Sequence, residues 1–216
     1  MAAISFYKEH TKDFNKTRVF PWPKTKDFLD SLPVNSNVLD IGCGNGRNMF
    51  YRRNLNMTGL ELTEELCQIV REKGGEIKQG NMINLPFEDN SFDYIICVAV
   101  YHHLENDIDR QKALNEMYRV LKPNGKVFIE VWAMEQPKRS RRKFTKRDEM
   151  VPWKNPKGEL LGYRYYHIYR NGDLEEEINR LESNFKLNQV IYEEGNWINI
   201  LVKNNSNISK INGCYI

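Results

Sequence analysis

The sequence predicts an α/β fold in which a doubly wound, mostly parallel sheet of seven strands carries helices on both faces. A short apolar run at residues 37–41 leads into a glycine-rich turn, which is typical of a strand that meets a ligand. Strand and helix patterns then alternate through five cycles to about residue 131, and this alternation favours a parallel sheet. Two final strand-like runs, residues 185–192 and 197–202, predict a terminal antiparallel hairpin.

Length and composition are consistent with a single domain. The chain has 216 residues, of which we assign 1–203 to the domain and 204–216 to a flexible tail. No apolar run approaches the roughly 18 residues of a membrane span, and the mixed charges before residue 14 do not resemble a secretory signal. We therefore expect a cytoplasmic protein, with a nuclear pool left open. Four cysteines without a C-x-x-C pair predict reduced thiols and no metal site.

Two helical segments are expected before the first strand. Residues 4–14 place apolar side chains on one face, which suits a helix that covers the domain. A Pro-Trp-Pro run at residues 21–23 favours an extended entry, and Pro23 suits the first turn of a helix that ends near Leu32. Arg18 precedes this rigid run and is a candidate for the cofactor cleft, although spacing alone favours a surface position.

The turn after the first strand contains three alternate glycines. Glycine lets the backbone reach positive φ and lie close to a ligand, because it has no side chain. A dinucleotide-binding fingerprint would have its third glycine at position 47, which is Arg47. Here the third glycine comes earlier, at Gly46, and Asp40 stands two residues before the first one. Residues 47–51 are expected to open a helix, and an ordinary strand-to-helix turn remains the alternative for this motif alone.

Polar side chains follow the next two strands. Glu61 lies near the end of the strand at residues 57–62, about 20 residues after the turn begins, where a doubly wound fold places a carboxylate for ribose hydroxyls. A helix-start acid is the alternative interpretation. Asn81 follows the strand at residues 76–80, whose charges indicate a sheet edge, and its amide offers a donor and an acceptor to an adenine edge.

The fourth strand, residues 94–100, is a continuous apolar run of the kind found at the centre of a parallel sheet. His102 and His103 follow at its carboxyl end, where open α/β sheets bind ligands, so we favour a contact with the reaction centre over polar packing. A helix over residues 107–121, closed by Lys-Pro-Asn-Gly, and a fifth strand at residues 126–131 complete the parallel part.

Basic residues are concentrated in one segment, which we assign to a loop insertion over residues 138–162. Without this segment, the remainder of the chain is mildly acidic, although the whole carries a net charge of +3. A basic patch on an acidic body is typical of a polyanion-binding surface, whereas a solvated loop is the commoner explanation of a charge run. The cations are Lys138, Arg139, Arg141, Arg142, Lys143, Lys146 and Arg147.

Several segments give the chain a specific resemblance. The order of Asp40 and the glycines is similar to the first motif of class I S-adenosylmethionine (SAM)-dependent methyltransferases. Beyond that, the chain resembles the eukaryotic tRNA methyltransferases that esterify 5-carboxymethyluridine at the anticodon wobble position. The segments that carry this resemblance are residues 17–18, 21–23, 98–103, 131–136, 151–153, 163–170 and 195–197. Members of this family usually have aspartates where this chain has Glu61 and Asn81, and both replacements keep hydrogen-bonding ability.

The resemblance implies a cofactor, a substrate and a partner: SAM, tRNA and a small zinc-binding activator protein that would form a heterodimer with this chain. The residues expected to bind SAM are Asp40, Gly42, Cys43, Gly44, Gly46, Glu61, Asn81, Met82 and Val98. A carboxylate nucleophile is already ionised at neutral pH, so the protein must orient and desolvate it rather than deprotonate it. Arg18, His102 and His103 are the candidates for orienting it. Tyr165 and His167 are expected to line the site and, with the basic segment, to bind RNA.

Two other functions remain open from the sequence alone. A methyltransferase of a small metabolite would share the glycine turn and Glu61, but it would have no use for the seven clustered cations. A non-catalytic RNA-binding scaffold on the same fold would keep the cations, but it would not need the glycine turn.

Overall fold

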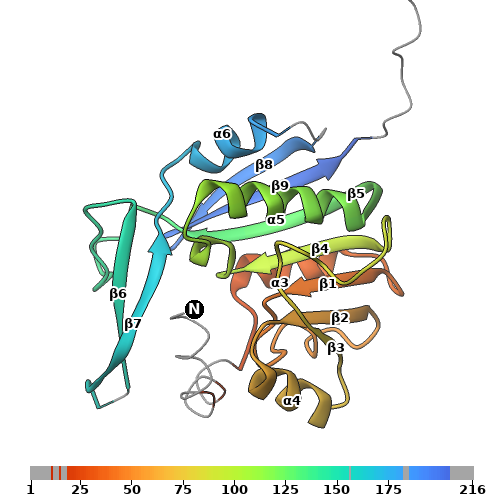
Figure 1. Cartoon of the computed structure of the whole chain (residues 1–216), viewed down its shortest axis with the longest axis horizontal. Coiled ribbons are helices and arrows are strands. Elements are labelled where there is room, and N and C mark those ends of the chain that lie inside the picture. The colour runs from red at the N-terminus through yellow and green to blue at the C-terminus, as the bar shows by residue number, and fades with distance from the viewer. Residues whose placement is uncertain (1–10, 12–14, 16–18, 156, 182–184, 205–216) are drawn as a thin grey trace, which may run out of the picture.

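The computed structural model describes Thr11, Asn15 and residues 19–155, 157–181 and 185–204. Its main body is a seven-stranded sheet in the order β3-β2-β1-β4-β5-β9-β8 (Figure 1). The strands from β3 to β5 run parallel, whereas β9 and β8 run antiparallel to their neighbours. The strands are β1 (Asn37–Ile41), β2 (Asn56–Glu61), β3 (Glu76–Gln79), β4 (Phe92–Val98), β5 (Leu121–Trp132), β8 (Phe185–Glu193) and β9 (Asn196–Lys203). The expected fold class and the terminal hairpin are confirmed.

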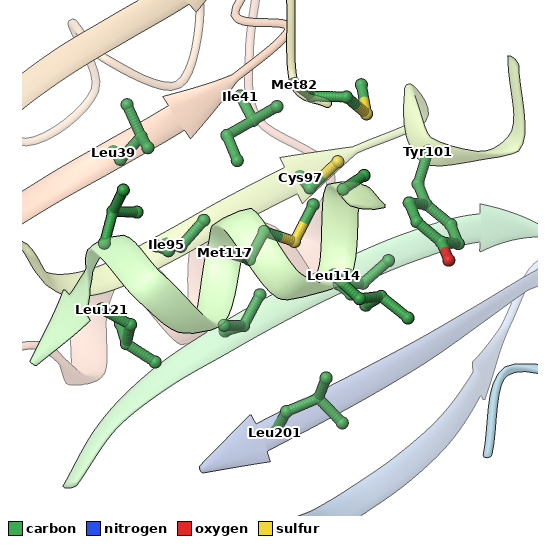
Figure 2. Close-up of a cluster of buried hydrophobic side chains, with 14 of the residues drawn as sticks. Leu39, Ile41, Met82, Ile95, Cys97, Tyr101, Leu114, Met117, Leu121 and Leu201 are labelled. Carbon is green, nitrogen blue, oxygen red and sulfur yellow. The ribbon is translucent and has the colours of Figure 1, made fainter. Parts of the chain in front are cut away.

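Helices cover both faces of the sheet, because each presents an apolar stripe to it. On one face, Leu114 and Met117 of α5 (Asp107–Val120) lie over Ile95 and Cys97 of β4 (Figure 2). On the other face, Phe28 of α3 (Pro23–Ser31) packs against Phe128 of β5, with 5.0 Å between ring centroids. The described helices are α3 (Pro23–Ser31), α4 (Glu64–Glu72), α5 (Asp107–Val120), α6 (Asp173–Asn179) and the 3₁₀ turn η1 (Tyr101–His103).

Most of the helices and strands lie where the sequence predicts them. α3 begins at Pro23, β3 is an edge strand, and β4 lies at the centre of the sheet between β1 and β5. α5 ends at Val120, but β5 starts directly afterwards at Leu121 rather than at residue 126. The helix expected at residues 4–14 falls largely outside the described residues. Arg18 and residues 205–216 of the expected tail also lie outside them.

The helix expected at residues 47–51 is a series of turns instead. One helical hydrogen bond forms there, from the Phe50 N–H to the Gly46 carbonyl at 3.1 Å. The side-chain oxygen of Asn45 accepts the Arg47 N–H at 3.3 Å, a local bond that competes with helix geometry. Arg52 then donates to the Leu29 and Leu32 carbonyls at the end of α3, at 2.5 and 2.8 Å. These contacts hold the segment close to α3 and prevent a regular helix.

A separate two-stranded hairpin stands beside the sheet (Figure 1) and corrects the assignment of residues 138–162 as a loop. β6 (Asp148–Lys154) and the first residues of β7 (Leu160–His167) lie within that range and pair antiparallel. Exposure alternates along β6 with the period of two that a half-buried strand requires. The hairpin joins the sheet through Tyr169, whose N–H donates to the Trp132 carbonyl at 3.0 Å and whose carbonyl accepts the Met134 N–H at 2.7 Å.

No helix in the described part of the chain is long and apolar enough to cross a membrane. Cys43, Cys67 and Cys97 are buried free thiols. The described residues contain no group of three or more histidine, cysteine, aspartate or glutamate side chains that could hold a metal ion.

Candidate functional site

A cavity of about 640 Å³ lies at the carboxyl ends of the central parallel strands. One part of its lining comes from the glycine turn after β1 and from the ends of β2 and β4. The other part comes from η1, from Trp132 at the end of β5 and from the β6–β7 hairpin. The sheet and the hairpin therefore line the cavity together. The residues expected to bind the cofactor that line this cavity are Gly42, Cys43, Gly44, Glu61, Asn81, Met82 and Val98.

The glycine turn is folded against the end of β2. The N–H groups of Gly42 and Cys43 both donate to the Leu60 carbonyl, at 2.7 and 3.1 Å. Gly42 has a φ of +66°, and a Cβ at this position would lie 2.5 Å from a methyl group of Val100, which also lines the cavity. Gly46 is not part of the lining, and the ring of Phe50 occupies the space beside it. Gly42 and Gly44 therefore shape the cavity, whereas Gly46 permits packing behind it.

Glu61 ties the turn to the start of α4. One carboxylate oxygen accepts the Leu62 and Thr63 N–H groups at 2.9 and 3.0 Å, and the other accepts the Gly44 N–H at 3.1 Å. Burial raises the pKa of Glu61, while these three hydrogen bonds act in the opposite direction. A carboxylate has about four acceptor positions, so this one can still accept a bond from a ligand hydroxyl. Glu61 thus supports the helix start and also lines the cavity, and its contact with ribose hydroxyls stays a prediction.

Asp40 lies beneath the turn rather than in the cavity lining. Its side chain is buried, and one carboxylate oxygen has no hydrogen-bond partner among the described residues. Burial raises the pKa of Asp40 to about 7, against the opposing effects of the nearby Arg47 charge and the Asn48 side chain. Burial therefore disfavours the charged form of Asp40, and its unpartnered oxygen is an acceptor that the described residues leave unused.

The two histidines have different surroundings. His103 lines the cavity, and its Nδ1 donates to the Tyr165 carbonyl at 2.8 Å. His102 is fully buried outside the lining, and its Nδ1 accepts the Trp132 N–H at 3.1 Å. Burial lowers the pKa of His103 to about 4 and that of His102 well below its ordinary value. These shifts favour neutral rings at pH 7, and the contact of either histidine with a substrate carboxylate stays a prediction.

The period of two along β7 decides which of its side chains reach the cavity. Arg164 and Tyr166 line it, whereas Tyr165 and His167 do not. The Tyr165 hydroxyl and the His167 Nδ1 both bond to one oxygen of Asp148, the histidine at 2.7 Å. Tyr165 and His167, which the sequence suggested as lining residues, are therefore held on the other side of the strand. The sequence did not identify Arg164 as a lining residue. The available signal was that Arg164 and Tyr166 lie two residues apart and so share one face of the strand.

Aromatic rings and guanidinium groups form a column at the hairpin end of the cavity. Trp132 and Tyr166 are stacked, with 4.1 Å between centroids and 13° between planes. The Arg142 guanidinium carbon lies 3.8 Å from the Trp132 ring centre. The Arg164 guanidinium carbon lies 5.2 Å from the Tyr166 ring centre and 5.3 Å from that of Trp153. We call Trp153, Arg164, Tyr166, Trp132 and Arg142 the stacked column.

The seven cations of the basic segment divide into three groups. Arg139 pairs with Glu194 at 2.6 Å, and Arg147 pairs with Asp173 at 2.7 Å. Arg142 lines the cavity. The other four are exposed and have no ion-pair partner among the described residues; they are Lys138, Arg141, Lys143 and Lys146. Those four form the part of the segment that is open to a polyanion.

Comparison with known proteins gives a consistent picture. A family model described as a methyltransferase domain matches residues 39–129. The tRNA (carboxymethyluridine(34)-5-O)-methyltransferase of Schizosaccharomyces pombe is 32% identical over 219 residues, which cover 92% of this chain and 94% of that one. The corresponding alkbh8 protein of Xenopus tropicalis is 31% identical, over 91% of this chain and 40% of its own length. The chain thus matches almost the whole of the yeast relative and less than half of the frog relative.

Solved structures support the fold alone, because their sequence identities are low. The CcbJ methyltransferase of Streptomyces caelestis superposes with a TM-score of 0.74 at 11% identity, covering 93% of this chain and 98% of that one. A Haloferax volcanii methyltransferase, solved in complex with the Trm112 methyltransferase activator, superposes with a TM-score of 0.62 at 14% identity, covering 93% and 96%.

Proposed function

The chain belongs to the family of tRNA (carboxymethyluridine) methyltransferases, and from this membership we propose that it methylates the carboxylate of 5-carboxymethyluridine at the tRNA wobble position, forming the methyl ester. The observation that carries this assignment is the 32% identity to the yeast relative along nearly the full length of both chains. A small-metabolite methyltransferase and a non-catalytic scaffold are not favoured, because the curated relatives are named as tRNA methyltransferases and the glycine turn opens into a large cavity.

The glycine turn and its surroundings fit SAM, which supplies the methyl group as a sulfonium. Glu61 would accept hydrogen bonds from the ribose hydroxyls, and Asn81 with Met82 would lie against the adenine. The side-chain oxygen of Asn81 already accepts the Ile83 N–H at 3.2 Å, so the side-chain N–H₂ is the group left for a ligand. Asp40 lies outside the cavity lining, and its buried carboxyl has an oxygen with no hydrogen-bond partner among the described residues, so a direct contact with SAM stays a prediction.

The remaining task of the protein is to position the substrate carboxylate against the methyl group of SAM. A substrate carboxylate is ionised at neutral pH, so no side chain has to remove a proton. One carboxylate oxygen forms a bond to the methyl carbon while the bond from that carbon to sulfur breaks. The opposite charges of carboxylate and sulfonium cancel, and this favours a site with little water. Val98, Val100 and Tyr166 supply apolar walls for such a site, and the neutral ring of His103 lies beside them.

We also propose a small activator protein as a partner. The Haloferax volcanii methyltransferase, which shares the fold, was solved with the Trm112 activator. β3 is an edge strand of this chain, and its exposed residues leave an edge to which another strand can be added. Strand addition at β3 would enlarge the sheet without covering the cavity at its carboxyl end.

Mass spectrometry of nucleosides tests the proposed activity. We would incubate tRNA that carries 5-carboxymethyluridine with this protein, an activator of the Trm112 type and methyl-labelled SAM, and then digest the RNA. The expected product is the labelled methyl ester of that nucleoside, at the wobble position only. RNA that carries unmodified uridine is the matched control and should stay unlabelled. Absence of the ester from a preparation that binds both SAM and tRNA would contradict the proposal.

A further inference from the structure

Two arginines lie at the hairpin end of the cavity, away from the glycine turn. Arg164 belongs to β7 and is 6% exposed, whereas Arg142, in the basic segment before β6, is an exposed residue. Both line the cavity together with Trp153 and Tyr166. Burial and the nearby charge of Arg164 lower the pKa of Arg142, so the two guanidinium groups lie within each other's field. The hairpin and the basic segment before it therefore bring two like charges to one end of the cavity.

The stacked column fixes these guanidinium groups by their faces. Arg142 lies over Trp132 at 3.8 Å, and Arg164 lies near both Tyr166 and Trp153, at 5.2 and 5.3 Å. A guanidinium carries its five N–H donors in its plane, so stacking restrains the group while the donors point outward from its edge. Such edges match the two oxygens of a carboxylate, which arginine binds with paired hydrogen bonds.

The surroundings of the two arginines favour an anion. No carboxylate of the described residues lies within ion-pair distance of Arg142, although Arg139 and Arg147 of the same segment are paired. The neighbouring histidines contribute no negative charge, and the field of Arg164 helps to keep His103 neutral. Arg142 therefore lacks a carboxylate partner among the described residues while it lies in the field of a second arginine, so an anion that enters this end of the cavity lowers the energy of the site. In a tRNA substrate, this anion is either the carboxylate of the modified base or a backbone phosphate.

We propose that Arg142 and Arg164 together hold the carboxylate of the wobble 5-carboxymethyl group, an inference that rests on the proposed function. The two arginines then select the acid form of the nucleoside, and the neighbouring rings exclude water from it. Each carboxylate oxygen has two lone pairs, so an oxygen that accepts a hydrogen bond keeps one with which to attack the methyl carbon. This role replaces the one that the sequence suggested for the histidines.

The test compares two anticodon stem–loop RNAs that differ only at the wobble base. One carries 5-carboxymethyluridine, and the other carries its neutral amide, 5-carbamoylmethyluridine, on the same phosphate backbone. By fluorescence anisotropy, the unmodified protein should bind the acid about tenfold more tightly, because a hydrogen bond to a charged group is worth at least that factor. Arg142→Gln and Arg164→Gln should each bring the ratio of the two affinities towards one. Arg164→Lys keeps the charge without the planar donors and should keep part of the preference.

Arg141→Gln is the matched control, because Arg141 is an exposed neighbour of Arg142 that does not line the cavity. It should change both affinities by the same factor. SAM titration of every variant checks that the fold and the cofactor site are intact. If Arg164→Gln does not fold, the single variants Arg142→Gln and Arg164→Lys still provide the test.

The outcomes separate the possible errors. Equal binding of acid and amide by the unmodified protein overturns the inference, as does an equal loss for both RNAs in the glutamine variants, which would indicate a phosphate contact. If the ester forms but the variants keep the preference for the acid, only this inference fails. If the acid is preferred but no ester forms, the proposed function fails instead.

Discussion

At the scale of single residues, the glycines after β1 serve two purposes. Gly42 and Gly44 leave room at the cavity wall, whereas Gly46 lets Phe50 pack behind the turn. The sequence showed the spacing, but it did not show this division, because the partner of each glycine is a side chain that only the fold brings close. Val100, which faces Gly42, comes from the loop after β4.

The division makes Gly42 a testable position. In Gly42→Ala, the new methyl group would lie 2.5 Å from Val100 and the backbone would stay at positive φ, so Val100 must shift into the cavity. We expect SAM affinity, measured by isothermal titration, to fall by roughly tenfold, which corresponds to about 1.4 kcal/mol. Gly158→Ala is the control, since Gly158 also has positive φ but has open space around it. Unchanged SAM affinity in folded Gly42→Ala would show that this glycine does not shape the cofactor site.

The histidines show why a site is harder to predict than a fold. Their position after a central strand was a sound reason to expect function, and His103 does line the cavity. Their charge could not be read from the sequence, because it depends on burial that arises from Trp132 and Tyr166, far along the chain. Arg18, the third candidate for orienting the carboxylate, lies outside the described residues and stays a prediction.

At the scale of elements, the strands of the sheet were predictable and the β6–β7 hairpin was not. Buried parallel strands can be recognised in a sequence as continuous apolar runs, and β4 is an example. β6 is exposed on one face and follows a basic run, so its alternating pattern is weak and includes Pro152. The stacked column could therefore not be predicted, although all of its residues except Arg142 lie in segments that carry the family resemblance.

The basic segment before the hairpin carries a prediction of its own. Lys138, Arg141 and Lys143 are three of its four cations that are exposed and unpaired among the described residues, so they are available to RNA phosphates. Reversing all three to glutamate should weaken tRNA binding and flatten its salt dependence. The slope should fall by roughly 0.7 for each contact to single-stranded RNA that is lost, or about 0.9 for a duplex contact. Binding measured across a salt series checks this.

The control for this experiment reverses an equal number of charges elsewhere. Lys26, Arg71 and Lys112 each pair with an acid of their own helix, at 2.8, 2.5 and 3.6 Å. Reversing these three charges changes the net charge by the same amount. Any difference in tRNA binding between the two triple variants therefore arises from where the charges lie. The same salt slope for both would mean that the basic segment has no specific contact with RNA. SAM affinity should be unaffected in either case.

At the scale of the whole molecule, stability depends on buried carboxyls that hold the layers together. Glu130 of β5 is fully buried and accepts the Thr25 hydroxyl of α3 at 2.9 Å, so it links the sheet to its covering helix. Its other oxygen has no hydrogen-bond partner among the described residues. Burial raises the pKa of Glu130 to about 7, similar to that of Asp40. Both groups therefore resist ionisation in the folded protein.

This gives stability a definite dependence on pH. Between the ordinary carboxyl pKa and about 7, the folded state holds a proton on Glu130 that the unfolded chain has lost, so the free energy of unfolding falls as pH rises through that window. Glu130→Gln removes the titration, and we expect it to be more stable than the unmodified protein by roughly 2 kcal/mol at pH 8 and by much less at pH 5. Urea denaturation across this range provides the measurement, with exposed Glu88→Gln as the control. Parallel stability curves for both variants would contradict the assignment, while a residual slope in Glu130→Gln is expected from Asp40.

The composition of the cavity wall has an optical consequence. Of the four tryptophans in the chain, Trp22, Trp132 and Trp153 line the cavity, and Trp132 is stacked between a tyrosine and an arginine. Indole emission responds to the polarity and the charges around the ring, so we expect ligand binding to change the emission of these three tryptophans. The protein thus contains its own reporter, and occupancy of the cofactor end and of the hairpin end can be followed without a label.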